Sequence, residues 1–405
     1  MIGSWREAPP TAGLPLVWRD FVASRASLDR EVAAFLEQPS AQIESSGTAA
    51  LVIALESLKR RNHRRSVVIP AYTCPLVALA VIHCGLRPVI CDTRPGHFDL
   101  SPQALTEVCG EDTLAVVVTH LGGRVADLPT AAAIARRVGA YVVEDAAQAM
   151  GATLRGAPVG GLGDIGVYSL GVGKGLTIYA GGVLVAREDD LRREMREVSG
   201  QISVGRPGRE LRRLVELAGY WLLYRPAGLR LAFGVPLRRH LRAGRLIEAV
   251  GDDCSADLRL DRVGAWRRTI GASALQRLPM FLDASASRAL GRKSQLLAIE
   301  GVDVMGDVEG GAGVWPFFQV LMPSEAARDR ALERLWSRGV GVGRLFIHAL
   351  PDYGYLARAL GGARCSNARD FAARMLVITN SQWLGDQRFN AICAVLKGSI
   401  EGNDL

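Results

Sequence analysis

The sequence has no long apolar run, no paired cysteine motif and few aromatic residues. No stretch approaches the roughly 20 apolar residues that a membrane-spanning helix needs, and the first residues lack the apolar core of a signal peptide, so we expect a cytoplasmic protein. The seven cysteines include no Cys-x-x-Cys pair, and no histidine lies near two of them at ligand spacing. This excludes a disulfide framework and predicts no metal site. The aromatic share of 6% is low for an all-β binding module.

The surplus positive charge is confined to one segment. The 405 residues carry 49 Lys+Arg and 41 Asp+Glu, a net charge of +8. Residues 206–245 contain ten arginines and only two acidic residues, Glu210 and Glu216, so this segment carries the whole surplus and the rest of the chain is neutral. We expect no nucleic-acid partner, because phosphate binding along a groove needs basic residues spread over the fold.

Residues 43–186 alternate short β-branched runs with helical patterns, which is typical of βαβ units and a mainly parallel sheet. The Val and Ile runs indicate strands buried on both faces, so helices must cover both faces of the sheet. The expected strands are 67–69, 88–90, 115–119, 141–143, 165–169 and 182–186, and the expected helices between them include 49–60, 74–84 and 129–138.

After residue 190 the pattern changes to charged helices and then to a smaller α+β unit. We therefore predict an α/β protein with a large domain over residues 1–262, including an arginine-rich insertion at 200–250, and a small C-terminal domain over residues 263–405. The later expected elements are helices at 191–198, 209–224, 265–297, 324–338 and 367–375 and a strand at 313–320. Only Pro279 interrupts the pattern of the 265–297 helix.

Two local patterns suit a ligand site. Residues 45–51 (SSGTAAL) open a helix whose free backbone N–H groups and Thr48 hydroxyl could hold a phosphate, although a simple helix N-cap is the more common meaning of such a turn. Asp145 follows a buried strand at the edge where open α/β sheets bind their ligands, and an Asp that caps the next turn is the alternative.

Lys174 lies in a glycine-rich loop after the strand at 165–169. Lys59 and Lys174 are the only lysines among the first 290 residues, in a chain that otherwise uses arginine. A lysine amine can deprotonate and attack a carbonyl, whereas a guanidinium group stays charged. A phosphate-binding or exposed loop lysine is the alternative. The composition favours a chemical role for Lys174.

Five motifs in this order resemble the DegT/DnrJ/EryC1/StrS family of pyridoxal-phosphate-dependent sugar aminotransferases. They are residues 45–51 (SSGTAAL), 70–73 (PAYT), 85–92 (GLRPVICD), 144–151 (EDAAQAMG), and Ser169 with Lys174 five residues later. Residues 367–380 show a fainter likeness. The resemblance implies the aspartate-aminotransferase-like fold type I, with a mainly parallel seven-stranded sheet covered by helices and a smaller C-terminal α+β domain.

The resemblance also implies roles for individual residues toward pyridoxal 5'-phosphate. Lys174 would form a Schiff base with the cofactor and then move a proton between substrate and cofactor carbons. Asp145 would pair with the pyridinium nitrogen, and Gln148 would contact the phenolate side of the ring. The phosphate would be held by Gly47, Thr48 and Ser169.

The chain departs from the family pattern at the ring and at the phosphate. Cys74 stands where an aromatic residue often stacks on the ring, and a thiol cannot supply a comparable π-face. Either Tyr72 or another residue is expected to cover the ring, or the ring is held less tightly. Segment 264–269 has no asparagine to reach the phosphate of a neighbouring subunit, so Arg267 or Arg268 is the expected replacement, with an ordinary surface arginine as the alternative. His120 and His348 are further candidates for the pocket, with a structural hydrogen bond as the alternative.

The activity implied by the resemblance is transamination in ping-pong order. An amino donor, glutamate in most relatives, loads the cofactor, and the amino group passes to a keto carbon of a nucleotide-linked sugar or a related cyclic polyol. Another pyridoxal-phosphate reaction such as dehydration, or a non-catalytic membrane-associated paralogue, stays open. The expected partners are the keto substrate, the amino donor and a second copy of the chain in a homodimer.

The arginine-rich segment poses a separate question. As a helix over 209–224 it would place Leu211, Val215 and Leu222 on an apolar face with Leu214, Ala218 and Trp221. Together with residues 229–237 this suits an interfacial hairpin, so segment 206–245 is a candidate for peripheral contact with the inner face of an anionic membrane. The alternative is a helical insertion whose apolar face packs on the body of the protein or on a dimer partner.

Overall fold

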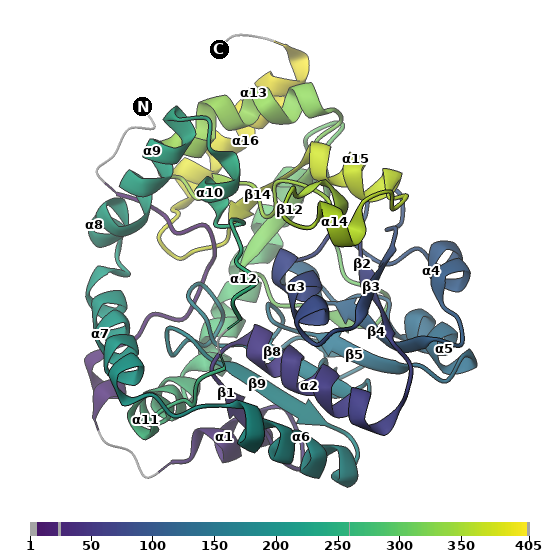
Figure 1. Cartoon of the computed structure of the whole chain (residues 1–405). Coiled ribbons are helices and arrows are strands. Elements are labelled where there is room, and N and C mark those ends of the chain that lie inside the picture. Colours follow the sequence, from purple (N-terminus) through teal and green to yellow (C-terminus); the bar gives the residue numbers. More distant parts are fainter. Residues whose placement is uncertain (1–5, 23–25, 259, 403–405) are drawn as a thin grey trace.

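A seven-stranded sheet forms the centre of the computed structural model, which describes residues 6–22, 26–258 and 260–402 (Figure 1). The strand order is β1-β9-β8-β5-β4-β2-β3, and β9 alone among these seven runs against the others. The strands are β1 (Gln42–Glu44), β2 (Ser66–Pro70), β3 (Arg87–Cys91), β4 (Thr113–Thr119), β5 (Tyr141–Asp145), β8 (Ile165–Ser169) and β9 (Gly182–Ala186).

Helices cover both faces of this sheet. All seven residues of β4 are buried, as expected for a central strand between two helical layers. Helices α2, α3 and α6 pack together, whereas α4 and α5 form a separate pair against β3, β4 and β5. The bounds are α2 (Gly47–Arg61), α3 (Pro75–His83), α4 (Pro102–Val108), α5 (Leu128–Arg137) and α6 (Asp189–Ile202).

A second, smaller sheet has the order β10-β12-β14-β13 and is entirely antiparallel. It has its own apolar core, to which α13 and α16 contribute. Its elements are β10 (Asp303–Val304), β12 (Phe317–Leu321), β13 (Val342–Gly343), β14 (Met375–Thr379), α13 (Glu325–Leu335), the short helix η4 (Trp336–Arg338), α15 (Ser366–Arg374) and α16 (Asp386–Glu401).

The two parts are joined by more than one chain crossing. The small strand β11 (Gly311–Ala312) pairs with β6 (Thr153–Leu154), which also pairs with β7 (Ala157–Pro158). Residues 6–14 run from the small sheet to the large one, since Ala8 bonds to Gly339 and Leu14 bonds to Gly175. The remaining elements are η1 (Trp18–Phe21), α1 (Leu28–Phe35), η2 (Leu121–Gly123), α11 (Ala265–Leu275), α12 (Leu278–Leu297), η5 (Leu350–Asp352) and α14 (Ala357–Leu360).

The arginine-rich insertion is a succession of helices along one edge of the molecule, from α11 to the small sheet's helix α13 (Figure 1). Its elements are α7 (Pro207–Leu223), α8 (Pro226–Leu229), the π-helical η3 (Arg230–Gly234), α9 (Val235–Arg242) and α10 (Leu246–Val250). Among the described residues, none of the helices combines the length and the apolar character needed to cross a bilayer.

The predicted fold class is confirmed, with a mostly parallel seven-stranded sheet and a small C-terminal sheet. Two predicted elements are wrong in detail. The predicted helix at 265–297 is two helices, because the helix is interrupted at Gln276 and Arg277. Pro279 does not cause this interruption, since it belongs to the first turn of α12. The strand at 313–320 begins only at Phe317, since Val314 bonds instead to Gly123. The domain division at residue 262 stays a prediction.

Candidate active site

The residues predicted to form a site surround one cavity at the carboxyl edge of the large sheet. Thr119, Asp145 and Ser169 end the parallel strands β4, β5 and β8, so the three side chains reach the same edge. The cavity has a volume of about 280 Å³. The structure brings all seven predicted residues to its wall: Gly47, Thr48, Cys74, Asp145, Gln148, Ser169 and Lys174.

The N-terminus of α2 offers an anion site on this wall. Ser46 caps the helix, its hydroxyl accepting from Ala49 N at 3.0 Å. Within the described chain, the backbone amides of Gly47 and Thr48 have no acceptor, so they are available to a ligand. A Cβ on Gly47 would lie 3.2 Å from Ser169 Cβ, tighter than ordinary packing, so glycine lets the helix approach the end of β8. The donors therefore converge as phosphate binding requires.

Asp145 lies at the base of the cavity. Its Oδ1 accepts from Ala147 N at 3.1 Å, which fixes the carboxylate orientation. Burial raises the pKa of Asp145, while Lys174 and His120 act in the opposite direction. A cationic ring nitrogen placed against the carboxylate would favour its ionised form, because opposite charges stabilise one another at short range.

Lys174 reaches the cavity from the glycine-rich loop between β8 and β9. Desolvation lowers the pKa of its amine, and the neighbouring Cys74 and Asp145 only partly oppose that shift. A lowered pKa increases the fraction of neutral amine, which is the nucleophilic form. The loop is supported by the N-terminal segment, where Leu14 N donates to Gly175 O at 3.1 Å and a Cβ on Gly13 would lie 2.7 Å from Lys174 O.

Gln148 is oriented by the backbone next to it. Gly122 N donates to Gln148 Oε1 at 2.7 Å, so the amide nitrogen Nε2 keeps its two hydrogens for other partners. Gly122 has a φ of +64°, and a Cβ there would collide with Gln319 and Phe317. Glycine at 122 therefore allows the backbone to point its N–H at Gln148.

His120 lines the cavity but is tied into the structure behind it. Its Nδ1 accepts from Ala126 N at 3.1 Å, and its Nε2 lies 3.0 Å from Glu144 Oε2. Because Nδ1 accepts, the proton sits on Nε2 and is donated to the carboxylate. Glu144 also accepts from the backbone amides of Gly160, Leu162 and Gly163. This buried network fixes the backbone immediately before Asp145, so His120 makes the structural hydrogen bonds given above as its alternative and also lines the cavity.

Cys74 is on the cavity wall beside Lys174, and burial raises the pKa of its thiol to about 12. Phe346, in the loop after β13, lines the same cavity. Tyr72 does not replace the missing aromatic wall, since it is buried against Phe346 and Phe371 and is absent from the cavity lining. Phe346 is thus the aromatic side chain that the structure adds to the site, and no local motif indicated it.

The arginines expected to replace the family's asparagine are held within their own chain. Arg267 donates to Glu210 through Nε at 2.8 Å and Nη2 at 2.6 Å, and Arg268 pairs with Asp29 at 2.9 Å. Neither lines the cavity. Both guanidinium groups are held by carboxylates of their own chain, and their expected contact with the phosphate of a neighbouring subunit stays a prediction. His348 also lies outside the cavity lining, with its ring against Tyr353.

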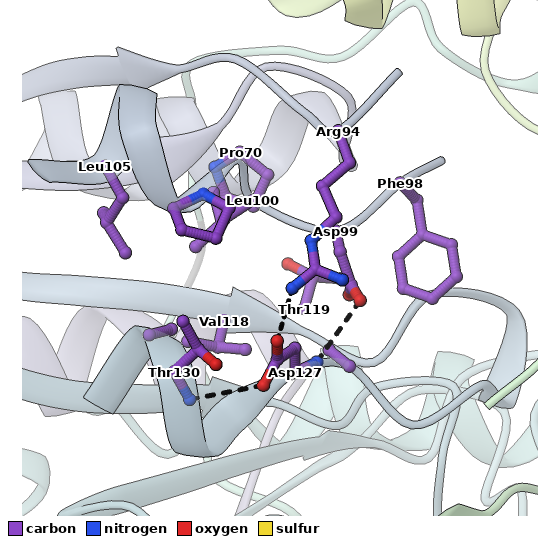
Figure 2. Close-up of a pocket in the computed structure, with 13 residues that line it drawn as sticks. Pro70, Arg94, Phe98, Asp99, Leu100, Leu105, Val118, Thr119, Asp127 and Thr130 are labelled. Carbon is purple, nitrogen blue, oxygen red and sulfur yellow. Dashed lines mark hydrogen bonds and ion pairs between the residues drawn. The ribbon is translucent and has the colours of Figure 1, made fainter. Parts of the chain in front are cut away.

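A second, much smaller cavity also has Thr119 in its lining (Figure 2). Its volume of about 10 Å³ is enough for a single water molecule. Arg94 forms an ion pair with Asp127, whose backbone amide donates to Asp99 Oδ2 at 3.3 Å. Asp99 Oδ1 is buried without a partner in the described chain. This cavity is too small for an organic ligand.

The donor set of the larger cavity fits pyridoxal phosphate. The unpaired amides of α2 and the hydroxyls of Thr48 and Ser169 suit its dianionic phosphate, Asp145 suits a ring nitrogen, and Lys174 suits its carbonyl carbon. A desolvated lysine, a buried carboxylate and a helix N-terminus at one sheet edge are typical of pyridoxal-phosphate enzymes with the aspartate-aminotransferase-like fold.

Comparison with known proteins identifies the family. The chain belongs to the DegT/DnrJ/EryC1/StrS aminotransferase family, whose sequence profile matches residues 23–397. This is a family of enzymes that depend on pyridoxal phosphate, and one structural neighbour, a putative sugar aminotransferase from Streptococcus pneumoniae, was solved in its pyridoxal-phosphate form.

Curated relatives match over part of their length. Identity is 36% over 157 residues with GDP-perosamine synthase of Caulobacter vibrioides, covering 39% of this chain and 42% of that protein. It is 36% over 175 residues with L-glutamine:2-deoxy-scyllo-inosose aminotransferase of Streptomyces fradiae, covering 42% and 41%. The matched regions thus span less than half of these relatives.

Solved structures match over nearly the whole chain. DesI, solved with its TDP-sugar product, gives a TM-score of 0.75 at 19% identity and covers 98% of this chain and 94% of its own. The sugar aminotransferase CalS13 from Micromonospora echinospora gives 0.72 at 22% identity, with 96% and 100% covered. At these identities the likeness establishes the fold.

Proposed function

We propose that this protein is an aminotransferase that moves an amino group from glutamate or glutamine to a keto carbon of a nucleotide-linked sugar or a related cyclic polyol. The observation that carries the proposal is the amine of Lys174, whose pKa is lowered by desolvation, in one cavity with Asp145 and the N-terminus of α2. The curated relatives, which act on such substrates by name, support the substrate class.

Each residue of the cavity has a separate role toward the cofactor or the substrate. Gly47, Thr48 and Ser169 hold the phosphate of the cofactor, and Asp145 orients its ring nitrogen. When bound, pyridoxal phosphate supplies a conjugated ring that accepts the electrons released at the substrate carbon. Lys174 Nζ, whose pKa is lowered by desolvation, would be the base that takes up the proton from that carbon and later returns it.

The test begins with the loaded protein. Borohydride treatment followed by peptide mapping is expected to place the cofactor mass on the peptide that contains Lys174. A screen of keto-sugar nucleotides and ketocyclitols with glutamate or glutamine is then expected to give an aminated product by mass spectrometry. The Lys174→Ala variant should lose transfer. Full activity in that variant would refute the assignment, and a loaded wild-type protein that accepts no amino donor would favour a non-transaminase reaction.

We also propose a homodimer, as the family resemblance implies. Static light scattering on the loaded protein is expected to give twice the mass of the 43.5 kDa chain. A monomer with full activity would contradict the proposal.

A further inference from the structure

Helix α7 has two apolar faces on opposite sides. One face packs on the body through Leu217, Tyr220 and the adjacent Tyr224, which are all buried. At 100° per residue, Leu211, Val215 and Leu222 lie on a single stripe about 180° away from that face. These three side chains are 64%, 65% and 62% exposed. Of the predicted apolar face, Trp221 packs on Phe21, whereas Leu211, Val215 and Leu222 stay exposed.

The exposed stripe has a counterpart in the next helical stretch. Leu231 and Val235 are four residues apart and are 68% and 52% exposed. Helices α7, α8 and α9 follow one another along the same edge of the molecule (Figure 1). With Leu223, which is 41% exposed, Leu and Val are exposed at six positions of this 40-residue segment. These are more than the isolated apolar side chains normal on a protein surface.

Cationic groups accompany these apolar residues. Arg225, Arg239, Arg242 and Arg245 are exposed and, in the described part of the chain, have no carboxylate partner. Arg212 and Arg213 share the single carboxylate of Glu216. The insertion therefore presents unneutralised positive charge beside exposed apolar side chains.

We propose that segment 206–245 is a docking surface for an anionic phospholipid bilayer, with the apolar stripe of α7 inserted at the headgroup boundary and the arginines on the lipid phosphates. An amphipathic helix with an arginine-rich margin has the chemistry for this contact, and each arginine near the surface adds to the attraction. The stripe is free for the membrane because the helix is already fixed to the protein by its opposite face.

A second copy of the chain is a poorer occupant of the same surface. A two-fold interface places the same patch on both subunits, so it would bring together two segments that each carry the whole +8 surplus. Facing like charges is unfavourable, whereas an anionic surface neutralises them. Charge complementarity therefore selects the bilayer.

The experiment is co-sedimentation of the purified full chain with vesicles of phosphatidylglycerol and phosphatidylcholine, and with pure phosphatidylcholine. We expect binding to the anionic vesicles at low salt, little binding to the neutral ones, and release at about 1 M salt, where the Debye length is about 3 Å. Arg239→Gln/Arg242→Gln should lower the partition coefficient about fivefold for each arginine. The Leu211→Ser/Val215→Ser/Leu222→Ser variant should lower it by about tenfold or more.

Matched controls separate docking from general surface effects. Leu290→Ser removes a 72% exposed leucine from α12, and Arg136→Gln/Arg137→Gln removes two exposed arginines at the end of α5. Both should bind like the wild type. Each variant is first checked for an unchanged thermal midpoint, and the single variant Leu222→Ser replaces the triple one if that fails to fold.

Three results would overturn the proposal. They are no co-sedimentation at low salt, equal loss of binding in the control variants, or conversion of an oligomer to a monomer by the α7 substitutions. The last would show that a second copy covers the stripe. Because none of these readouts uses enzymatic activity, failure here is distinguishable from failure of the proposed aminotransferase function.

Discussion

The phenol of Tyr224 bonds to the backbone of the segment that supports the Lys174 loop. Gly13 N donates to the Tyr224 hydroxyl at 3.1 Å, and the hydroxyl donates to Thr11 O at 3.2 Å. Gly13 in turn packs against Lys174 O so closely that a Cβ would lie 2.7 Å away. The residue at the end of α7 therefore reaches the candidate catalytic lysine through one intervening segment of backbone.

Removing that hydroxyl should loosen the lysine loop. In Tyr224→Phe the buried N–H of Gly13 and carbonyl of Thr11 lose their partner, which is expected to lower the free energy of unfolding by about 1–3 kcal/mol. Affinity for pyridoxal phosphate should fall by up to about tenfold, since a loosened loop must be ordered on binding. Urea unfolding and cofactor titration measure the two effects. Tyr141→Phe is the control, because the Tyr141 hydroxyl has no hydrogen bond in the described chain, and equal losses in both variants would refute the link.

Gly182 is predicted to be essential for the phosphate site. A Cβ at this position would lie 2.8 Å from Gly47 N and still closer to Ser46 O, so Gly182→Ala must push the start of α2 away from β9. We expect a loss of about 1–3 kcal/mol in stability and more than tenfold weaker cofactor binding. Gly291→Ala, at an exposed helix position with open space, should instead gain about 0.5–1 kcal/mol and bind normally. Normal cofactor affinity in Gly182→Ala would contradict the geometry of the site.

The buried carboxyl of Asp99 should make the free energy of unfolding depend on pH. Burial raises the pKa of its carboxyl to about 6, although Arg94 and the hydrogen bond from Asp127 N act in the opposite direction. His97 nearby has a pKa lowered to about 4, so it is neutral through most of this window. The folded state therefore holds a proton that the unfolded state releases near pH 3.8, and stability contributed by that proton is lost as the pH rises toward 6.

The Asp99→Asn variant should remove this dependence. It keeps an acceptor for Asp127 N and carries no charge (Figure 2). We expect it to be more stable than the wild type by about 1–3 kcal/mol at pH 8 and no more stable at pH 4, measured by unfolding across that range. Asp127→Asn, which weakens the ion pair with Arg94, should be destabilising at pH 8. A constant difference between Asp99→Asn and the wild type at all pH values would exclude Asp99 as the titrating group.

Cys74 should be a poorly reactive thiol despite its place on the cavity wall. With a pKa raised to about 12 by burial, it holds little thiolate at pH 8, and the thiolate is the form that reagents attack. Alkylation of Cys74 in the native protein should be at least about a hundredfold slower than in urea, measured by mass spectrometry. Rapid native labelling at Cys74 would indicate a solvated thiol and contradict the burial.

Much of the large domain could be predicted because its signals are local. The strands at 165–169 and 182–186 have the predicted bounds, since short Val-rich runs between glycines have few alternatives. Lys174 and Asp145 were predicted as site residues from residue type and position after a strand, and the structure places both on the cavity wall. The interruption between α11 and α12 was expected at Pro279, because proline usually interrupts a helix. Proline is also favoured in the first turn of a helix, and this is where Pro279 lies.

The remaining features depend on contacts distant in sequence. Nothing near Thr11 or Gly13 indicates that this segment lies on the lysine loop, and Phe346 reaches the cavity from the distant segment after β13. The helix at 207–223 was correctly expected, but apolar residues occur on two of its faces, and the pattern alone does not say which one meets the body. The face that packs on the body is the one with Tyr220 and Tyr224, which are buried in tertiary contacts.

The bond between Gly13 and Tyr224 joins residues 211 positions apart. Closing so long a loop has a large entropic cost, and the contact contributes nothing until both ends are in place. The lysine loop lies about 50 residues before Tyr224 in the chain, so it is synthesised earlier. It gains its full support only after the end of α7 has been synthesised and has folded onto residues 11–13. During synthesis and refolding, cofactor-binding competence should therefore appear late, after the large sheet has formed.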